Sequence, residues 1–211
     1  MKFNTLFFDV DDTLYPADCG LWQAIKARIG QYMQECLHIP AEQVPVLRQQ
    51  YYEKYGTALK GLEFNYPVDI KKYLDYVHDV PLERYFSPQP KLASVLQAIP
   101  ARKILFTNAN ANHASRIVHA LGLETCFDGV IDVEAMSPYC KPMPESFEIA
   151  LHLAGDPAPA QCALFDDLPR TTRAAHARGI FSVLISAALP EDASCADAWL
   201  SDWSQLPGLL G

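Results

Sequence analysis

The stretch FNTLFFDVDDTLY, at residues 3–15, joins a short apolar run to a group of carboxylates. The apolar run ends at Phe8 and is rich in aromatic and branched side chains, which is typical of a strand buried on both faces of a parallel sheet. Asp9, Asp11 and Asp12 follow it, and their charges repel unless a cation or a proton lies among them. Because ligands of open α/β sheets bind at the carboxyl ends of strands, this pattern predicts a magnesium and phosphate site.

Length and composition restrict the class of protein. The chain has 211 residues, of which 50% are hydrophobic and 20% charged, as expected for one globular domain or for one domain that carries a sizeable insertion. The net charge of -8 argues against binding to a nucleic-acid polymer. Six cysteines without a CxxC pair indicate reduced thiols, and we expect a cytoplasmic protein without a signal peptide or membrane span. The expected partner is a small phosphorylated metabolite, and the oligomeric state is left open.

Strands and helices alternate after residue 90, which predicts an α/β fold with a parallel sheet flanked by helices. The expected strands lie at 103–107, 130–133, 162–165 and 181–185, and the expected helices begin near 91, 111 and 144. Further along, Trp199 and Trp203 are expected to cover a sheet edge.

Residues 16–90 carry no strand signal and are predicted to form an all-helical insertion after the first strand. Helical periodicity covers about 21–37, 41–55 and 68–78. Gly56 and Gly61 bracket a probable loop or broken helix. Residues 1–15 and 91–211 would then form the core domain.

Asp9 and Asp11 have the chemistry that a phosphate site needs. A carboxylate can attack phosphorus and hold an aspartyl-phosphate. A second carboxyl nearby can protonate the leaving oxygen and then deprotonate water. The residues alone leave another interpretation open, in which these acids only cap the next helix.

Two more polar groups lie near the ends of predicted elements, one after a strand and one, Lys141, held outside a helix by prolines. Thr107 and Asn108 end a buried strand, where a hydroxyl and backbone N–H groups at a helix N-terminus can bind an anion. Alternatively, Asn108 or Asn110 only caps that helix. Lys141 can neutralise a nucleophilic carboxylate and a phosphoryl group, unless it is a solvated surface lysine.

Asp166 and Asp167 end another predicted strand and suit magnesium, although they could instead cap the following helix. Lys60, between the two glycines of the insertion, is a candidate substrate contact, while a solvated lysine is the simpler interpretation. The histidines show no ligand spacing and are expected to be surface or half-buried residues: His38, His78, His113, His119, His152 and His176.

These polar groups match, in order, the four signature motifs of a known family. The matching residues are FDVDDTL at 8–14, Thr107-Asn108, Lys141 in KPMPESF, and FDD at 165–167. Together they resemble the haloacid dehalogenase superfamily of hydrolases, over about residues 1–15 and 91–211. The resemblance implies a Rossmann-like α/β core, with the helical insertion 16–90 as a cap that closes over the active site and selects the substrate.

The resemblance also implies roles for individual residues. Asp9 would be the nucleophile and Asp11 the general acid and base. Thr107 and Asn108 would hold the phosphate, and Lys141 would orient both the nucleophile and the phosphate.

A magnesium ion is implied as well. Its ligands would be Asp9, the backbone carbonyl of Asp11, and one or both of Asp166 and Asp167. Relatives often carry Ser and Asn in the fourth motif where this chain has Leu168 and Thr171, so the groups that support the metal-binding acids are expected to differ.

Residues 9–16 and 55–62 further resemble the pyrimidine 5′-nucleotidase-like group, which implies a nucleoside monophosphate substrate such as uridylate or cytidylate. Open alternatives are a phosphatase of sugar phosphates or phosphoglycolate, a phosphomutase, and a catalytically silent binding protein on the same fold. A true haloacid dehalogenase attacks carbon and needs neither magnesium nor an acid two residues after the nucleophile. Asp11 and the Asp166-Asp167 pair therefore favour chemistry at phosphorus.

Overall fold

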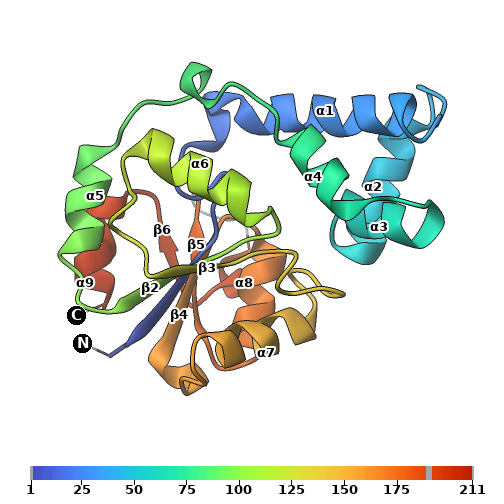
Figure 1. Ribbon diagram of the computed structural model, residues 1–211. Coiled ribbons are helices and arrows are strands. Elements are labelled where there is room, and N and C mark those ends of the chain that lie inside the picture. Colours follow the sequence, from blue (N-terminus) through green and yellow to red (C-terminus); the bar gives the residue numbers. More distant parts are fainter. Residues whose placement is uncertain (1, 189–191, 211) are drawn as a thin grey trace. The chain divides into compact units, whose positions relative to one another are not determined.

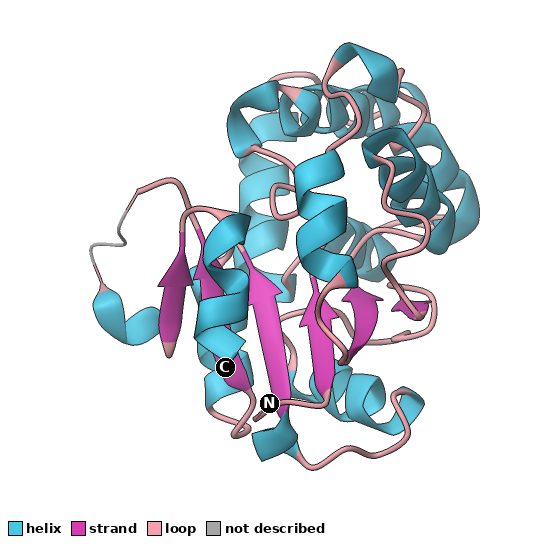
Figure 2. Cartoon of the chain, turned by 90° about the vertical axis from the view of Figure 1, so that its left-hand side faces the viewer, coloured by secondary structure: helices cyan, strands magenta, loops and turns pink. Residues whose placement is uncertain are grey.

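The computed structural model describes residues 2–188 and 192–210 and contains a six-stranded sheet. All paired strands are parallel, and their order is β3-β2-β1-β4-β5-β6 (Figures 1 and 2). The strands are β1 (Thr5–Phe8), β2 (Arg102–Phe106), β3 (Gly129–Ile131), β4 (Cys162–Asp166), β5 (Phe181–Ile185) and β6 (Ala198–Leu200). The predicted α/β fold with a parallel sheet is confirmed.

Strand β1 lies at the centre of the sheet, between β2 and β4, and all four of its residues are buried. Its side chains alternate between the two faces. Phe7 packs edge-on against Phe106 of β2, with ring centroids 5.9 Å apart. Phe8 stacks on Phe165 of β4 at 4.7 Å. The apolar run therefore forms a strand because both of its faces are covered by core side chains.

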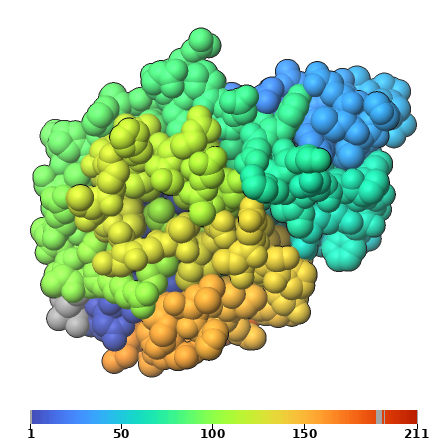
Figure 3. Space-filling model, in the orientation of Figure 1, coloured from blue at the N-terminus to red at the C-terminus, as the bar shows by residue number. Residues whose placement is uncertain are grey.

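Helices cover both faces of the sheet (Figure 1). On one face lie α5 (Pro90–Gln97), α6 (Ala111–Leu121) and α9 (Leu206–Leu210), and on the other lie α7 (Pro144–Leu153) and α8 (Pro169–His176). Helices α6 and α7, coloured yellow-green and golden, form part of the surface seen in Figure 3. This arrangement leaves the carboxyl ends of the central strands as the place where loops and helix N-termini gather.

The segment between β1 and α5 is helical throughout its regular structure, as predicted. Apart from short 3-10 turns, it contains α1 (Leu21–Glu35), α2 (Val44–Tyr55), α3 (Ala58–Asn65) and α4 (Ile70–Val77). Residues Ala17–Tyr85 form one compact unit, and the described residues up to Pro16 and from Phe86 onward form another. Among the described residues, no helix is long and apolar enough to cross a membrane.

Of the two expectations for the segment between Gly56 and Gly61, a loop or a broken helix, the structure shows the broken helix: α2 ends at Tyr55 and α3 begins at Ala58. The side chain of Thr57 caps this helix by accepting a hydrogen bond from the Lys60 backbone N–H at 3.1 Å. A Cβ atom at Gly61 would lie 2.1 Å from Cγ of Tyr51. Gly61 therefore serves the close approach of α3 to α2 rather than a turn.

The C-terminal part of the chain differs from expectation in two ways. The sheet has a sixth strand, β6, which contains Trp199 and forms an edge. Trp203 does not cover an edge: its ring lies 5.9 Å from both Phe8 and Phe165, over the two central strands. Ala198–Leu200 is only three residues long and contains a single branched aliphatic side chain, so its pattern is too short to indicate a strand.

Candidate active site

The acidic and polar residues singled out in the sequence meet at the carboxyl ends of the three central strands. Asp9 directly follows β1, Thr107 follows β2, and Asp167 follows β4. The backbone N–H of Asp9 still donates to the Phe165 carbonyl at 2.9 Å, so the ladder continues to the first acid. Because β1 pairs with both neighbours in parallel, the carboxyl ends of all three strands lie on the same side of the sheet.

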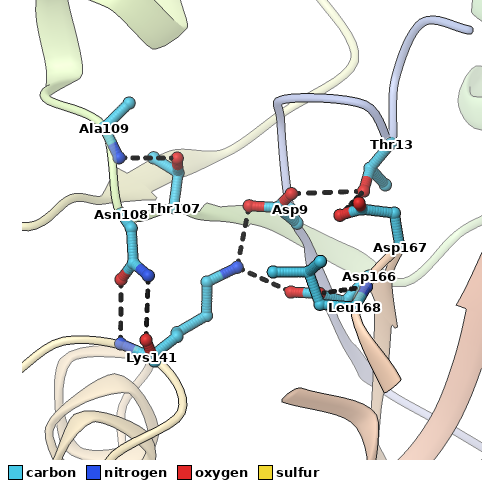
Figure 4. A network of polar contacts seen from close by, with 9 residues as sticks. All are labelled: Asp9, Thr13, Thr107, Asn108, Ala109, Lys141, Asp166, Asp167 and Leu168. Carbon is cyan, nitrogen blue, oxygen red and sulfur yellow. Dashed lines mark hydrogen bonds and ion pairs between the residues drawn. The ribbon is translucent and has the colours of Figure 1, made fainter. Parts of the chain in front are cut away.

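Lys141 reaches into this group from the connection between β3 and α7 (Figure 4). Its Nζ donates to Asp9 Oδ1 and to Asp166 Oδ2, each at 2.7 Å. Only 4% of the lysine side chain is exposed, so the interpretation of a solvated surface lysine is wrong. Although burial disfavours its charge, Asp166 and Asp9 raise the pKa of Lys141, which therefore stays cationic.

Asp9, Asp166 and Asp167 form a cluster that could hold a metal ion. Each offers a carboxylate oxygen, and these oxygens lie within 4.8 Å of one another. Burial raises the pKa of Asp9 to about 7, with Lys141 opposing and Asp166 adding to the shift. Burial also raises the pKa of Asp167 to about 9, and Asp166 and Asp9 add to it. A single lysine does not offset three carboxylates, of which Asp9 and Asp166 are buried and Asp167 is half-buried, and a hard divalent cation such as Mg²⁺ fits the oxygen donors.

The two adjacent acids have different neighbours. Both oxygens of Asp166 accept hydrogen bonds, Oδ2 from Lys141 and Oδ1 from the Leu168 backbone N–H at 3.0 Å. The Thr13 hydroxyl lies 3.4 Å from Asp167 Oδ1 and 3.2 Å from Asp9 Oδ2. One hydroxyl proton can serve only one of these acceptors at a time. Asp166 is thus bound firmly to Lys141. Asp167 is linked to Asp9 only through long contacts with the Thr13 hydroxyl.

Thr107 and Asn108 lie beside Lys141, but the helix cap is at a different residue. The Asn110 side chain caps α6 by accepting from the His113 backbone N–H at 3.0 Å. The Asn108 amide instead clamps the Lys141 backbone: its Nδ2 donates to the Lys141 carbonyl at 2.9 Å, and its Oδ1 accepts from the Lys141 N–H at 2.8 Å. Thr107 is buried, and its hydroxyl accepts from the Ala109 N–H at 3.0 Å.

Sequence reasoning missed two partners of Asp11. The Tyr15 hydroxyl donates to Asp11 Oδ1 at 2.8 Å, and His113 Nε2 lies 2.8 Å from the same oxygen. Burial raises the pKa of Tyr15, and the neighbouring Asp11 adds to the shift. His113 is fully buried, contrary to the expectation of a surface or half-buried histidine. The available signal was its place three residues after Asn110, in the first turn of the helix that follows the second motif.

Comparison with known proteins assigns the family. The sequence model of the haloacid dehalogenase-like hydrolase family matches residues 3–179 of this chain. The chain belongs to this family. The yeast Saccharomyces cerevisiae protein "Phosphate metabolism protein 8" is 30% identical over 195 residues, which cover 86% of this chain. The aligned part spans 61% of that relative's length.

Solved structures of the family share the fold. The HAD-family protein YfnB from Bacillus subtilis, solved with bound magnesium, superposes with a TM-score of 0.65 at 18% identity, covering 100% of both chains. A HAD phosphatase from Thermococcus onnurineus gives a TM-score of 0.67 at 15% identity, covering 100% of this chain and 98% of that one. At these identities the likeness concerns the fold.

The fourth motif of this haloacid dehalogenase-like chain carries Leu168 where relatives often have Ser. The backbone N–H of Leu168 donates to Asp166 Oδ1 at 3.0 Å. Thr171 is buried in α8.

In the helical unit, Lys60 is not solvated, because only 10% of its side chain is exposed and its Nζ pairs with Glu63 at 2.9 Å.

Proposed function

We propose that this haloacid dehalogenase-like hydrolase is a magnesium-dependent phosphatase of small phosphomonoesters that acts through an aspartyl-phosphate on Asp9. The observation that carries the proposal is the contact of Lys141 Nζ with Asp9 Oδ1 inside a cluster of three carboxylates, two of them buried. A nucleophilic carboxylate beside a fixed cation meets the main demand of phosphoryl transfer, which is to position the nucleophile and offset charge. When bound, magnesium would supply further positive charge for the phosphoryl oxygens.

The reaction proceeds in two steps. A carboxylate oxygen of Asp9 attacks phosphorus in line with the leaving oxygen, and the bond from phosphorus to that oxygen breaks while Asp11 gives it a proton. In the second step Asp11 takes a proton from water. The water oxygen then bonds to phosphorus, the bond to Asp9 breaks, and inorganic phosphate leaves. Lys141 holds Asp9 in place and offsets charge in both steps.

The proposal gives the remaining residues of the site defined tasks. Asp167 is the direct metal ligand from the fourth motif, together with Asp9 and the backbone carbonyl of Asp11, because both oxygens of Asp166 already accept hydrogen bonds. Thr107 and the backbone at Asn108 bind the phosphate. The Asn108 side chain supports this indirectly, since it fixes the segment that carries Lys141.

We assign residues 1–15 and 91–211 to the catalytic core and residues 16–90 to a cap that selects the substrate, with Lys60 as a candidate substrate contact. The two compact units, which divide at residues 16/17 and 85/86, support these boundaries. The proposed substrate is a nucleoside 5′-monophosphate of the pyrimidine type, supported by the residue patterns at 9–16 and 55–62. Six free cysteines agree with action in the cytoplasm.

Release of inorganic phosphate from a panel of phosphomonoesters, with and without magnesium, tests the proposal. Asp9→Asn should lower turnover by at least about a thousandfold. Asp156→Asn is the matched control. This aspartate is exposed, and it follows Ala154, whose carbonyl accepts from Arg102 at the opposite, amino end of β2. Release that is strongest on uridylate and cytidylate supports the nucleotidase specificity, whereas preference for sugar phosphates or phosphoglycolate discards it and keeps the mechanism. Wild-type protein that releases no phosphate from any ester overturns the proposal.

A further inference from the structure

One oxygen of Asp11 is held from two sides of the core unit. Tyr15, four residues further along the chain, donates its hydroxyl proton to Asp11 Oδ1 at 2.8 Å. His113, which is 102 residues away in sequence, brings Nε2 to the same oxygen, also at 2.8 Å. Both distances are those of well-formed hydrogen bonds. An ionised carboxylate only accepts hydrogen bonds, so the histidine must donate to it from Nε2–H.

Both partners are themselves fixed by packing. His113 is fully buried in the first turn of α6, and its backbone N–H is held by the Asn110 cap. Tyr15 is 3% exposed, and its ring stacks on Phe86 with centroids 5.0 Å apart. Neither side chain can leave Asp11 without opening the core. By contrast, Asp11 is 19% exposed in its side chain and lies in a loop after β1, so these two contacts with buried partners restrict its orientation.

Resting on the proposed function, we infer that His113 and Tyr15 are positioning residues that hold the general acid Asp11 by its Oδ1. Two donors on Oδ1 make that oxygen the acceptor in both protonation states of the carboxyl group. The proton that passes to the leaving oxygen, and later arrives from water, is therefore carried by Oδ2. Because the carboxyl group cannot rotate, its Oδ2 keeps a constant direction. General acid catalysis requires the proton donor to lie within hydrogen-bond distance of the leaving oxygen.

The dependence of the rate on the leaving group measures this role directly. Departure of an alkoxide needs the proton from Asp11, whereas nitrophenolate leaves readily without one. We therefore compare kcat/KM, which reports the step that expels the leaving group, for an alkyl phosphate and for p-nitrophenyl phosphate. In Tyr15→Phe and His113→Leu the ratio of alkyl to nitrophenyl kcat/KM should fall about tenfold or more.

Conservative variants separate positioning from packing. His113→Gln keeps an N–H donor near the position of Nε2 and should keep the ratio within about threefold of wild type. His119→Gln, at an exposed position of the same helix, should leave the ratio unchanged. Tyr15→Phe removes only a hydroxyl and decides the matter if the leucine variant fails to fold.

The outcomes are distinct. If the wild type hydrolyses both esters and Tyr15→Phe and His113→Leu lower both values of kcat/KM by the same factor, the two residues are structural and the inference is overturned while the proposed function stands. If the wild type hydrolyses neither these esters nor any other phosphomonoester, the proposed function falls and the inference falls with it.

Discussion

Lys141 and Asp166 form a buried ion pair at the carboxyl end of the central strand β4. Their Nζ and Oδ2 atoms are 2.7 Å apart, and only 4% and 1% of the two side chains are exposed. The same ammonium group contacts Asp9, so a single cation links the first and fourth motifs. Burying charges is costly unless each has its partners. The pair therefore couples the stability of the core to the geometry of the reaction centre.

Removing the cation should damage both stability and activity. Lys141→Met leaves Asp9 and Asp166 buried without their partner, and we expect it to lower the free energy of unfolding by about 3–5 kcal/mol and to abolish phosphate release. The double variant Lys141→Met/Asp166→Asn should recover part of the stability but none of the activity. Urea denaturation in the absence of magnesium measures the first quantity. Lys91→Met, at an exposed position of α5, is the control, and a Lys141→Met protein as stable as this control would contradict the expectation.

Magnesium should stabilise the protein more at high pH than at low pH. Asp9 and Asp167 have pKa values raised from 3.8 to about 7 and about 9 in the folded protein. Protons thus bind the folded state more tightly than the unfolded one, and the resulting stability is complete below pH 3.8 and is lost as pH rises through these values. Since magnesium competes with those protons, the rise in Tm that it causes should grow between about pH 5 and about pH 9.

The same titration identifies the direct metal ligand. In Asp167→Asn the rise in Tm with magnesium should largely disappear, and the metal-free protein should lose less stability as pH rises, because one carboxyl group with a raised pKa is gone. Potassium chloride at matched ionic strength controls for screening. An equal rise in Tm at both pH values, or an unchanged rise in the variant, would count against the metal site.

Lys60 can be tested apart from its ion pair. If the lysine contacts the substrate, Lys60→Met should raise KM about tenfold and leave kcat within about twofold, since the lost interaction is the same in the ground state and the transition state. Glu63→Gln removes the partner 2.9 Å away but keeps the lysine charge, and it should leave KM close to wild type. Identical kinetics of the two variants would show that Lys60 serves only the helical unit.

Two buried glycines should respond to alanine in opposite ways. A Cβ at Gly61 would lie 2.1 Å from Tyr51 Cγ, so Gly61→Ala should lower the free energy of unfolding by about 1–3 kcal/mol. At Gly30 in α1 the nearest atom to a Cβ is Val44 Cγ1, at an ordinary 3.5 Å. Gly30→Ala should therefore gain about 0.5–1 kcal/mol from helix propensity. Thermal unfolding of both variants measures the difference, and destabilisation by both would refute the packing argument.

Local patterns in the sequence were sufficient for the fold class and for the main reactive groups. The buried run ending at Phe8, the alternation of strands and helices after residue 90, and the absence of strand signals at 16–90 each reflect hydrophobic periodicity within one element. The motif acids could be selected because they follow strand ends and suit phosphoryl transfer, whereas Lys141 was selected because it occurs together with them in the order of the four family motifs. Parallel pairing of β1 with β2 and β4 is what brings those ends together.

The tertiary structure decided which of these groups touch one another. Three contacts are set by the docking of helices and loops on the sheet: His113 holds Asp11, Asn108 clamps the Lys141 backbone, and the Leu168 N–H donates to Asp166. Two of them join residues 102 and 33 positions apart. Hydrophobic periodicity indicates which face of an element is buried. The partner of a buried polar atom depends on how separate elements pack, and no local sequence pattern encodes that packing.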